Sequence, residues 1–322
     1  MKYFLVDNNS ISETKKSMKK TKWWTFLLSN IVVFLILGFL DNYVVYTFVK
    51  NVIAANYEGG AELFKQQLSD GTLPGNYEAS IMIVMMFAYL IIILGLYLFN
   101  RFYYKRNNAS FGLMNKGNLK AYIKGVLLGG ISFTFIVFIV MLIGNLKLSG
   151  PNNIDILIFV GLLIGWIIQG FFEEWVFRAI FMNGLAVKGN IILIIILNSL
   201  VFALMHGANP NLTILALINL FILGLVFSLV FYLFDNILVP AAFHSFWNFF
   251  QGNFYGIEVS GTKTAEAYSI FQSEISATND LITGGKFGIE GSIVCTIVIT
   301  IMLIACIYKI YKKGLITKEI ID

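Results

Sequence analysis

Residues 171–181 read FFEEWVFRAIF, and they lie within a run of sequence apolar enough to cross a bilayer. Into this run the chain places three ionisable residues, Glu173, Glu174 and Arg178. Each such group costs about 2.5–3.5 kcal/mol at the centre of a membrane helix, so it indicates a functional site by default. The only two histidines, His206 and His244, also lie in or beside apolar runs. These five residues are the first candidates for a membrane-embedded site.

The composition is that of a membrane protein. Of the 322 residues, 58% are hydrophobic and 13% are charged, whereas soluble domains carry about 25% charged residues. The net charge of +5 comes from basic residues clustered at the ends of apolar runs. That distribution favours orientation in a membrane over nucleic-acid binding. We therefore expect the lipid bilayer, and no nucleic acid, among the partners.

Hydropathy predicts an all-α polytopic membrane protein with about eight transmembrane helices. The apolar runs cover roughly residues 23–40, 80–100, 122–143, 154–184, 191–205, 212–234, a short seventh element after Pro240, and 291–310. None of them alternates polar and apolar residues as a membrane β-barrel would. The candidate residues lie in the fourth, fifth and seventh runs, so we expect the active site among those helices.

The basic residues predict the orientation of the chain. Lysines gather before Trp23, after the second run and after the last run. Placing both termini in the cytoplasm satisfies the positive-inside bias at nearly every loop. Residues 1–322 are then a single integral-membrane domain of the cell (plasma) membrane. Residues 41–79, with room for a short helix, and residues 252–290 are expected to be extracytoplasmic loops.

The two cysteines, Cys295 and Cys306, are expected to be unpaired. They lie eleven residues apart in one apolar run, which is about 16 Å along a helix. That separation is beyond the reach of a disulfide.

Helical spacing divides the three charges of residues 171–181. Glu174 and Arg178 stand one turn apart in the orientation that favours pairing, whereas Glu173 points about 100° away around the axis. Glu173 is therefore the carboxylate left available as a general base. The charge pattern alone equally allows both glutamates to be structural, locking helices together through buried hydrogen bonds.

The histidines also come with partners at helical spacing. Phe202 precedes His206 by one turn, and His244 and Asn248 share a helix face. His244 and Asn248 both carry N–H donors, so the pair could bind a developing oxyanion. Each histidine alone is equally compatible with a hydrogen-bonding role between helices.

Position along the chain tests whether these groups can meet. The turn between the fourth and fifth runs centres near Lys188. Measured along the axes of the two helices that it joins, Glu173 lies about 22 Å and His206 about 27 Å from this turn. They can therefore be neighbours in an antiparallel pair. His244 lies only eight residues beyond Asn236, so it joins them only if the seventh helix begins deep in the bundle.

Three ordered motifs are together more specific than any one of them. They read Glu173-Glu174-x-x-x-Arg178, Phe202-x-x-x-His206 and His244-x-x-x-Asn248. In this order they resemble the signatures of the CPBP (ABI) family. That family comprises CAAX-protease and bacteriocin-processing membrane proteins related to the Ras-converting CAAX endopeptidase. The resemblance covers a core of residues 154–256.

The resemblance implies an intramembrane endopeptidase of the glutamate type, a hydrolase acting on peptide bonds. By family analogy Glu173 and His206 activate a water molecule, and His244 and Asn248 stabilise the tetrahedral oxyanion. Structural support for the site is expected from Glu174, Arg178 and Phe202. The substrate is expected to be a membrane-associated peptide or protein: CAAX-like, a bacteriocin or a signalling peptide.

No cofactor is expected. A carboxylate and two imidazoles could ligate zinc, and the ligands would then be Glu173, His206 and His244. The His-Glu-x-x-His motif is absent, however, and the family resemblance favours metal-free chemistry.

Two non-proteolytic functions remain open on sequence alone. One is a bacteriocin-immunity or sensor-regulating membrane protein that binds a peptide or a kinase without cutting it, a role that the resemblance also includes. The other is a proton- or ion-coupled transporter, because buried Glu, Arg and His also mark proton paths. The absence of a visible inverted repeat counts against the transporter.

Overall fold

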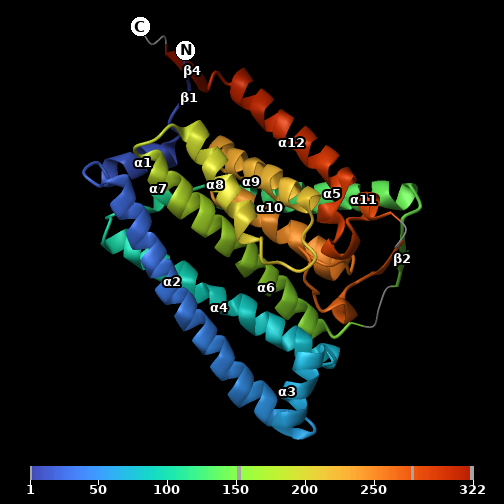
Figure 1. Cartoon of the computed structure of the whole chain (residues 1–322). Coiled ribbons are helices and arrows are strands. Elements are labelled where there is room, and N and C mark those ends of the chain that lie inside the picture. The colour runs from blue at the N-terminus through green and yellow to red at the C-terminus, as the bar shows by residue number, and fades with distance from the viewer. Residues whose placement is uncertain (1, 151–153, 277–278, 320–322) are drawn as a thin grey trace.

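The computed structural model describes residues 2–150, 154–276 and 279–319, and these are mostly helical (Figure 1). Within these residues, six continuous helical segments are long and apolar enough to cross a membrane. They are built on α2 (Trp23–Phe48), α4 (Gly75–Phe102), α5 (Asn118–Leu142), α6 (Ile156–Glu174), α9 (Ile214–Phe234) and α12 (Ile293–Lys312). The prediction of an all-α polytopic membrane protein is confirmed.

Two further helices of the bundle are shorter. They are α8 (Ile191–Met205) and α10 (Leu238–Phe249), the latter continued by a π-helical segment, η5 (Phe250–Phe254). At 1.5 Å per residue α8 covers about 22 Å, against a hydrocarbon core of about 30 Å. All eight predicted segments are therefore helical, but six of them, by length and composition, are candidates to span the bilayer.

The first predicted loop boundary, at residue 41, was wrong. The helix that starts with α2 continues through a π-helical segment (Val49–Ile53) and a 3-10 turn (Ala54–Asn56). The polar residues at the expected break are accommodated within it, since Asp41 is buried and Asn42 donates its amide to the Gly38 carbonyl. The expected short helix is present as α3 (Gly60–Asp70). Which side of the membrane this region faces stays a prediction.

Outside the bundle the described elements are short. The helix α1 (Asn9–Ser17) lies beside the N-terminal end of α2, α7 (Asn183–Ala186) closes the fourth segment, and α11 (Asp280–Thr283) precedes α12 (Figure 1). Within residues 252–290, β3 (Gln272–Ile275) pairs antiparallel with β2 (Leu146–Ser149). This region is thus tied to the end of α5.

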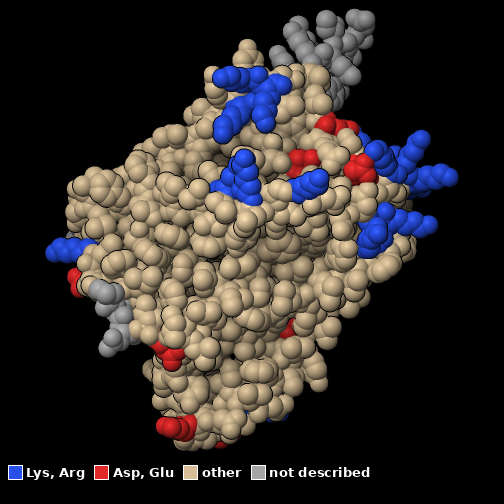
Figure 2. Space-filling model, turned by 180° about the vertical axis from the view of Figure 1, so that it is seen from behind, with Lys and Arg blue, Asp and Glu red and all other residues tan. Residues whose placement is uncertain are grey.

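The described ends of the chain lie together. An antiparallel ladder joins β1 (Lys2–Leu5) to β4 (Ile316–Glu319) (Figure 1). Figure 2 shows basic side chains gathered toward that end of the molecule and a broad, nearly uncharged surface below it. The two described ends therefore lie on one side of the bundle; the side of the membrane that they face stays a prediction.

Glycines hold α10 against two neighbouring helices. A Cβ atom on Gly125 or Gly129 of α5 would lie 2.3 Å from a backbone carbonyl oxygen of α10. A Cβ on Gly170 of α6 would lie 2.4 Å from Ser245 Oγ and 2.5 Å from Ser245 N. Small residues of this kind let membrane helices approach closely. The helix that carries His244 and Asn248 is therefore fixed between α5 and α6.

The contact between α5 and α10 can be tested by adding one methyl group. Gly129→Ala would force the new Cβ against the Phe243 carbonyl oxygen, so we expect a loss of about 1–3 kcal/mol of stability, as for overpacked cores. Gly38→Ala on α2 is the control, because nothing lies within 4 Å of its Cβ position. Thermal unfolding of the two purified variants in one detergent compares them. Equal melting temperatures would contradict the close approach.

Candidate active site

The charges predicted to pair do pair. Arg178 Nη1 lies 3.0 Å from Glu174 Oε1, and both side chains are fully buried. Arg178 Nη2 also donates to the Gly224 carbonyl at 3.0 Å, and the guanidinium lies 4.6 Å from the centre of the Phe202 ring. The arginine therefore joins α6 to α9 as well as compensating the Glu174 carboxylate.

The backbone beyond Glu174 is not a regular α-helix. Residues Trp175–Met182 form a π-helical segment, η4, between α6 and α7. The four-residue spacing was predicted for a regular α-helix, yet the Glu174–Arg178 contact still forms in this segment. Segments of π-helix are rare and often occur at functional sites.

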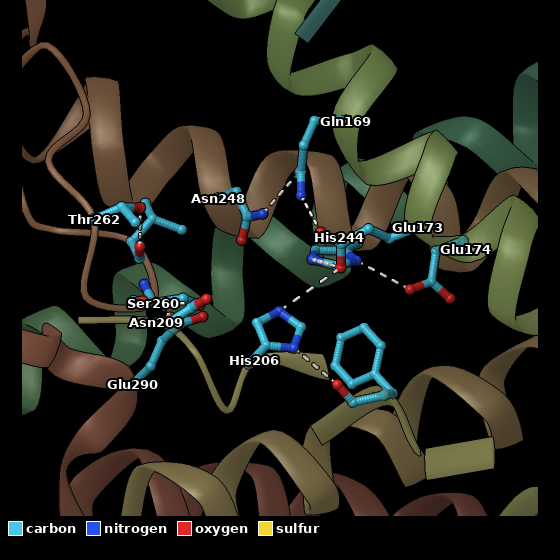
Figure 3. A network of polar contacts seen from close by, with 12 residues as sticks. Gln169, Glu173, Glu174, His206, Asn209, His244, Asn248, Ser260, Thr262 and Glu290 are labelled. Atoms are coloured by element: carbon cyan, nitrogen blue, oxygen red, sulfur yellow. Dashed lines mark hydrogen bonds and ion pairs between the residues drawn. The ribbon is translucent and has the colours of Figure 1, made fainter. Parts of the chain in front are cut away.

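Glu173 is the carboxylate on which two imidazoles converge. Its Oε2 atom lies 3.9 Å from His206 Nε2 and 3.8 Å from His244 Nε2 (Figure 3). Its Oε1 atom accepts a hydrogen bond from the side-chain amide of Gln169. The structure thus brings Glu173, His206 and His244 together, from the fourth, fifth and seventh predicted segments.

A backbone carbonyl orients His206. This residue directly follows α8, and its Nδ1 lies 2.8 Å from the carbonyl oxygen of Phe202. Because a carbonyl only accepts, Nδ1 carries a proton, and Nε2 is the nitrogen that faces Glu173. The Phe202-x-x-x-His206 spacing is therefore the geometry that selects the tautomer of this histidine.

His244 is held by the buried charge pair. Its Nδ1 lies 3.0 Å from Glu174 Oε1, the oxygen that also contacts Arg178. Its ring stacks on Phe227, with centroids 4.7 Å apart and planes at 18°. Nε2 is consequently left on the side of Glu173.

Packing between α6 and α10 gives His244 the position deep in the bundle that it needs to reach Glu173. Gly170 lies one turn before Glu174, and Ser245 directly follows His244. The close approach of Gly170 to Ser245 therefore sets the histidine beside the two glutamates. Estimating depth from residue counts could not include this helix contact.

Asn248 joins the site through a residue that the sequence analysis missed. Its Nδ2 donates to Gln169 Oε1 at 3.0 Å, while the Gln169 amide donates to Glu173. Gln169 thus bridges Glu173 and Asn248 (Figure 3). The signal was available, because Gln169 is a polar residue four positions, or about one helical turn, before Glu173 in an apolar run.

Residues 252–290 contribute a second network that sequence reasoning also missed. Buried Glu290 accepts from Trp247 Nε1 of α10 at 2.9 Å, and from the backbone N and the hydroxyl of Ser260 at 2.9 and 2.8 Å. Asn209 donates to the Ser260 carbonyl at 2.9 Å. This region therefore packs on the site (Figure 3) rather than standing apart from it. No motif marks Glu290.

The candidate residues line a cavity of about 600 Å³. Glu173, His206, His244 and Asn248 all contribute to its wall. Four methionines, Met82, Met85, Met86 and Met205, add flexible apolar surface, and Gln67, Glu78 and Lys263 add polar groups. The volume is in the range of ligand pockets, and the lining is mixed as such pockets are.

The candidate metal ligands do not form a metal-binding group. Within the described residues no three His, Cys, Asp or Glu side chains have that arrangement. The nearest atoms of Glu173 to His206 and His244 are 3.9 and 3.8 Å apart. Whether the protein uses a metal stays a prediction. Cys295 and Cys306 are free, as expected.

The buried pair gives a stability prediction. Arg178→Gln leaves the Glu174 carboxylate buried without its cation, and removal of one partner of a buried pair typically costs about 3–5 kcal/mol. A Glu174→Gln, Arg178→Gln double variant removes both charges and should recover part of that loss. Unfolding in detergent micelles measures both. The Glu174→Gln single variant completes the comparison. A double variant less stable than the parent by the sum of the two single-variant losses would argue against the pairing.

Comparison with known proteins reaches the same segment of the chain. Residues 153–250 match the family described as Type II CAAX prenyl endopeptidase Rce1-like. No curated protein and no solved structure matches the chain. The match covers under a third of the 322 residues, but it contains every motif residue of the site. The resemblance predicted from the three motifs is thus confirmed: residues 153–250 are similar to the Rce1-like type II CAAX prenyl endopeptidases.

Proposed function

We propose that the protein is an intramembrane endopeptidase that cleaves a membrane-associated peptide or protein. One observation carries the proposal: Glu173 Oε2 lies 3.9 and 3.8 Å from the Nε2 atoms of two histidines, at the wall of a cavity between membrane helices. The family match supports a CAAX-type protease at the level of the family. The roles of individual residues follow from their contacts.

Glu173 and His206 activate the water molecule. Both present a lone pair, since the His206 Nδ1 proton is directed to the Phe202 carbonyl. A water molecule about 2.8 Å from each of Glu173 Oε2 and His206 Nε2 would donate to one of these bases as its oxygen attacks the peptide carbonyl carbon. The base holds that proton until the C–N bond breaks, and then delivers it to the leaving amine.

His244 and Asn248 stabilise the oxyanion. Asn248 uses one amide proton on Gln169 and keeps the other for the substrate. His244 Nδ1 donates a hydrogen bond to Glu174 Oε1. When the ring is protonated, its Nε2–H is therefore available as a donor to the oxyanion. Removal of one such donor typically lowers kcat by about 10²–10³-fold. With this imidazolium, the charges of Glu173, Glu174, Arg178 and His244 cancel.

The substrate class follows from the cavity. Its methionine-rich wall suits a flexible or variable apolar segment, because methionine side chains adapt their shape. A CAAX-like protein end, a bacteriocin or a signalling peptide fits this description. We place the protein in the plasma membrane with both termini in the cytoplasm, since the joined ends of the chain lie where basic side chains gather (Figure 2).

Cleavage by the catalytic pair is tested with near-isosteric variants. Glu173→Gln and His206→Asn should each slow cleavage by about 10²–10⁴-fold, the range for loss of general-base catalysis. Glu274→Gln, an exposed carboxylate on β3, is the control. Mass spectrometry of membrane peptides from cells expressing each form identifies products. A farnesylated CAAX peptide serves as a defined probe in proteoliposomes.

The same variants separate proteolysis from binding alone. Products that form at equal rates with the parent and both variants would refute the proposed chemistry. A Glu173→Gln variant that still protects its host against a bacteriocin would instead establish the non-proteolytic immunity function.

Metal dependence gives an independent prediction. Treatment with 1,10-phenanthroline should leave the cleavage rate unchanged, because Glu173 and His206 can transfer the proton without a metal ion. Loss of cleavage that added zinc restores would reverse this assignment and make Glu173, His206 and His244 the ligands. The rate on the same peptide, with and without chelator, is the measurement.

A further inference from the structure

We propose that the protein binds an anionic phospholipid in a site formed by α5, α9 and α12. Two adjoining cavities make up this site. The first, here called the headgroup cradle, has a volume of about 410 Å³, and the second, the acyl groove, about 480 Å³. Both are lined by Lys124 and Phe234, so the two cavities adjoin at these side chains. Neither is lined by residues of the candidate active site.

Positive charge dominates the headgroup cradle. Lys116, Lys120 and Lys124 line it, spaced four residues apart where α5 begins. All three are exposed, and none forms an ion pair with a residue in the described part of the chain. The acidic residue in its lining, Asp235, accepts a hydrogen bond from the Ser10 backbone N at 3.0 Å. Three cations against one carboxylate leave a surplus suited to an anionic group.

The acyl groove has a different chemistry. Apart from Lys124 its lining is apolar except for Ser132, whose hydroxyl is directed to the Leu128 carbonyl of its own helix. The remaining lining residues come from α5, α9 and α12: Leu127, Leu128, Ile131, Phe135, Phe234, Val298, Ile301 and Met302. The groove can therefore accept hydrocarbon and offers nothing to a polar ligand.

The junction matches the boundary of a lipid molecule. Lys124 Nζ lies 5.2 Å from the centre of the Phe234 ring, and both residues line both cavities, so this ammonium stands where the cradle and the groove adjoin. From Lys120 to Phe135 the α5 surface extends about 22 Å. That length spans a headgroup and the roughly 15 Å depth of one hydrocarbon leaflet. A free phosphate would use the cradle alone, whereas a phospholipid uses both cavities.

The site lies on the helix that positions α10. The glycines at 125 and 129 of α5 contact α10, and the acyl groove occupies another side of α5. A lipid held along α5 would therefore stabilise the helix pair that carries His244 and Asn248. The proposal is independent of peptide cleavage, since it concerns binding and stability.

The test measures lipid binding by the full-length protein in detergent. Melting temperature and native mass spectrometry are followed on titration with phosphatidylglycerol, phosphatidylcholine or inorganic phosphate. We expect phosphatidylglycerol alone to raise the melting temperature and to remain bound. A Lys116, Lys120, Lys124→Gln triple variant should bind it about 100-fold more weakly, since each basic residue near an anionic lipid contributes a factor of about five.

A matched triple variant serves as the control. Lys309, Lys312 and Lys313→Gln, at the end of α12, remove the same charge from the same end of the molecule. They should leave binding unchanged, and both triple variants should melt like the parent in phosphatidylcholine. Filling the groove with Ile131→Trp should weaken phosphatidylglycerol binding without changing the charge. Equal losses in the two triple variants, equal protection by phosphatidylcholine, or full protection by inorganic phosphate would overturn the proposal.

Discussion

The buried carboxylate of Glu174 is the constraint on which the site depends. One of its oxygens contacts both Arg178 and His244, each at 3.0 Å. A charge so fully removed from water is tolerable only with partners of opposite sign and good geometry. Its partners hold His244 with Nε2 toward Glu173 and bring the arginine onto the Gly224 carbonyl of α9. One electrostatic need thereby links α6, α9 and α10.

Close packing supplies what electrostatics cannot. An ion pair fixes distances between side-chain ends, but it leaves the helices free to slide. The glycines of α5 and α6 remove that freedom by bringing backbones against α10. The reactive groups then occupy a wall of one cavity, with Gln169 joining the proposed base to the proposed oxyanion donor. Polar contacts and small residues act together, and neither would position the site alone.

Local periodicity predicted the features that depend on local geometry. The helical class and the Glu174–Arg178 pair follow from apolar runs and a four-residue spacing, and the ordered motifs lie within the segment that the family model matches. Features that depend on contacts between segments distant in the sequence could not be predicted from local periodicity. The depth of His244 depends on Gly170 meeting Ser245, and Glu290 reaches Trp247 only through the folding of residues 252–290. The helix past Asp41 was missed because a polar pair resembles a boundary unless its hydrogen bonds are known.

The Glu290 network has a consequence for how this fold can be divided. The Glu290 carboxylate accepts hydrogen bonds from the Trp247 indole and from the Ser260 hydroxyl. The backbone carbonyl of Glu290 accepts another from the Asn219 side chain. The family match ends at residue 250, whereas Glu290, which accepts these hydrogen bonds, lies forty residues further along the chain. The matched segment therefore lacks some of the contacts that complete its own fold. Transplanted alone, it would expose an indole N–H without its acceptor and lose one wall of its own cavity.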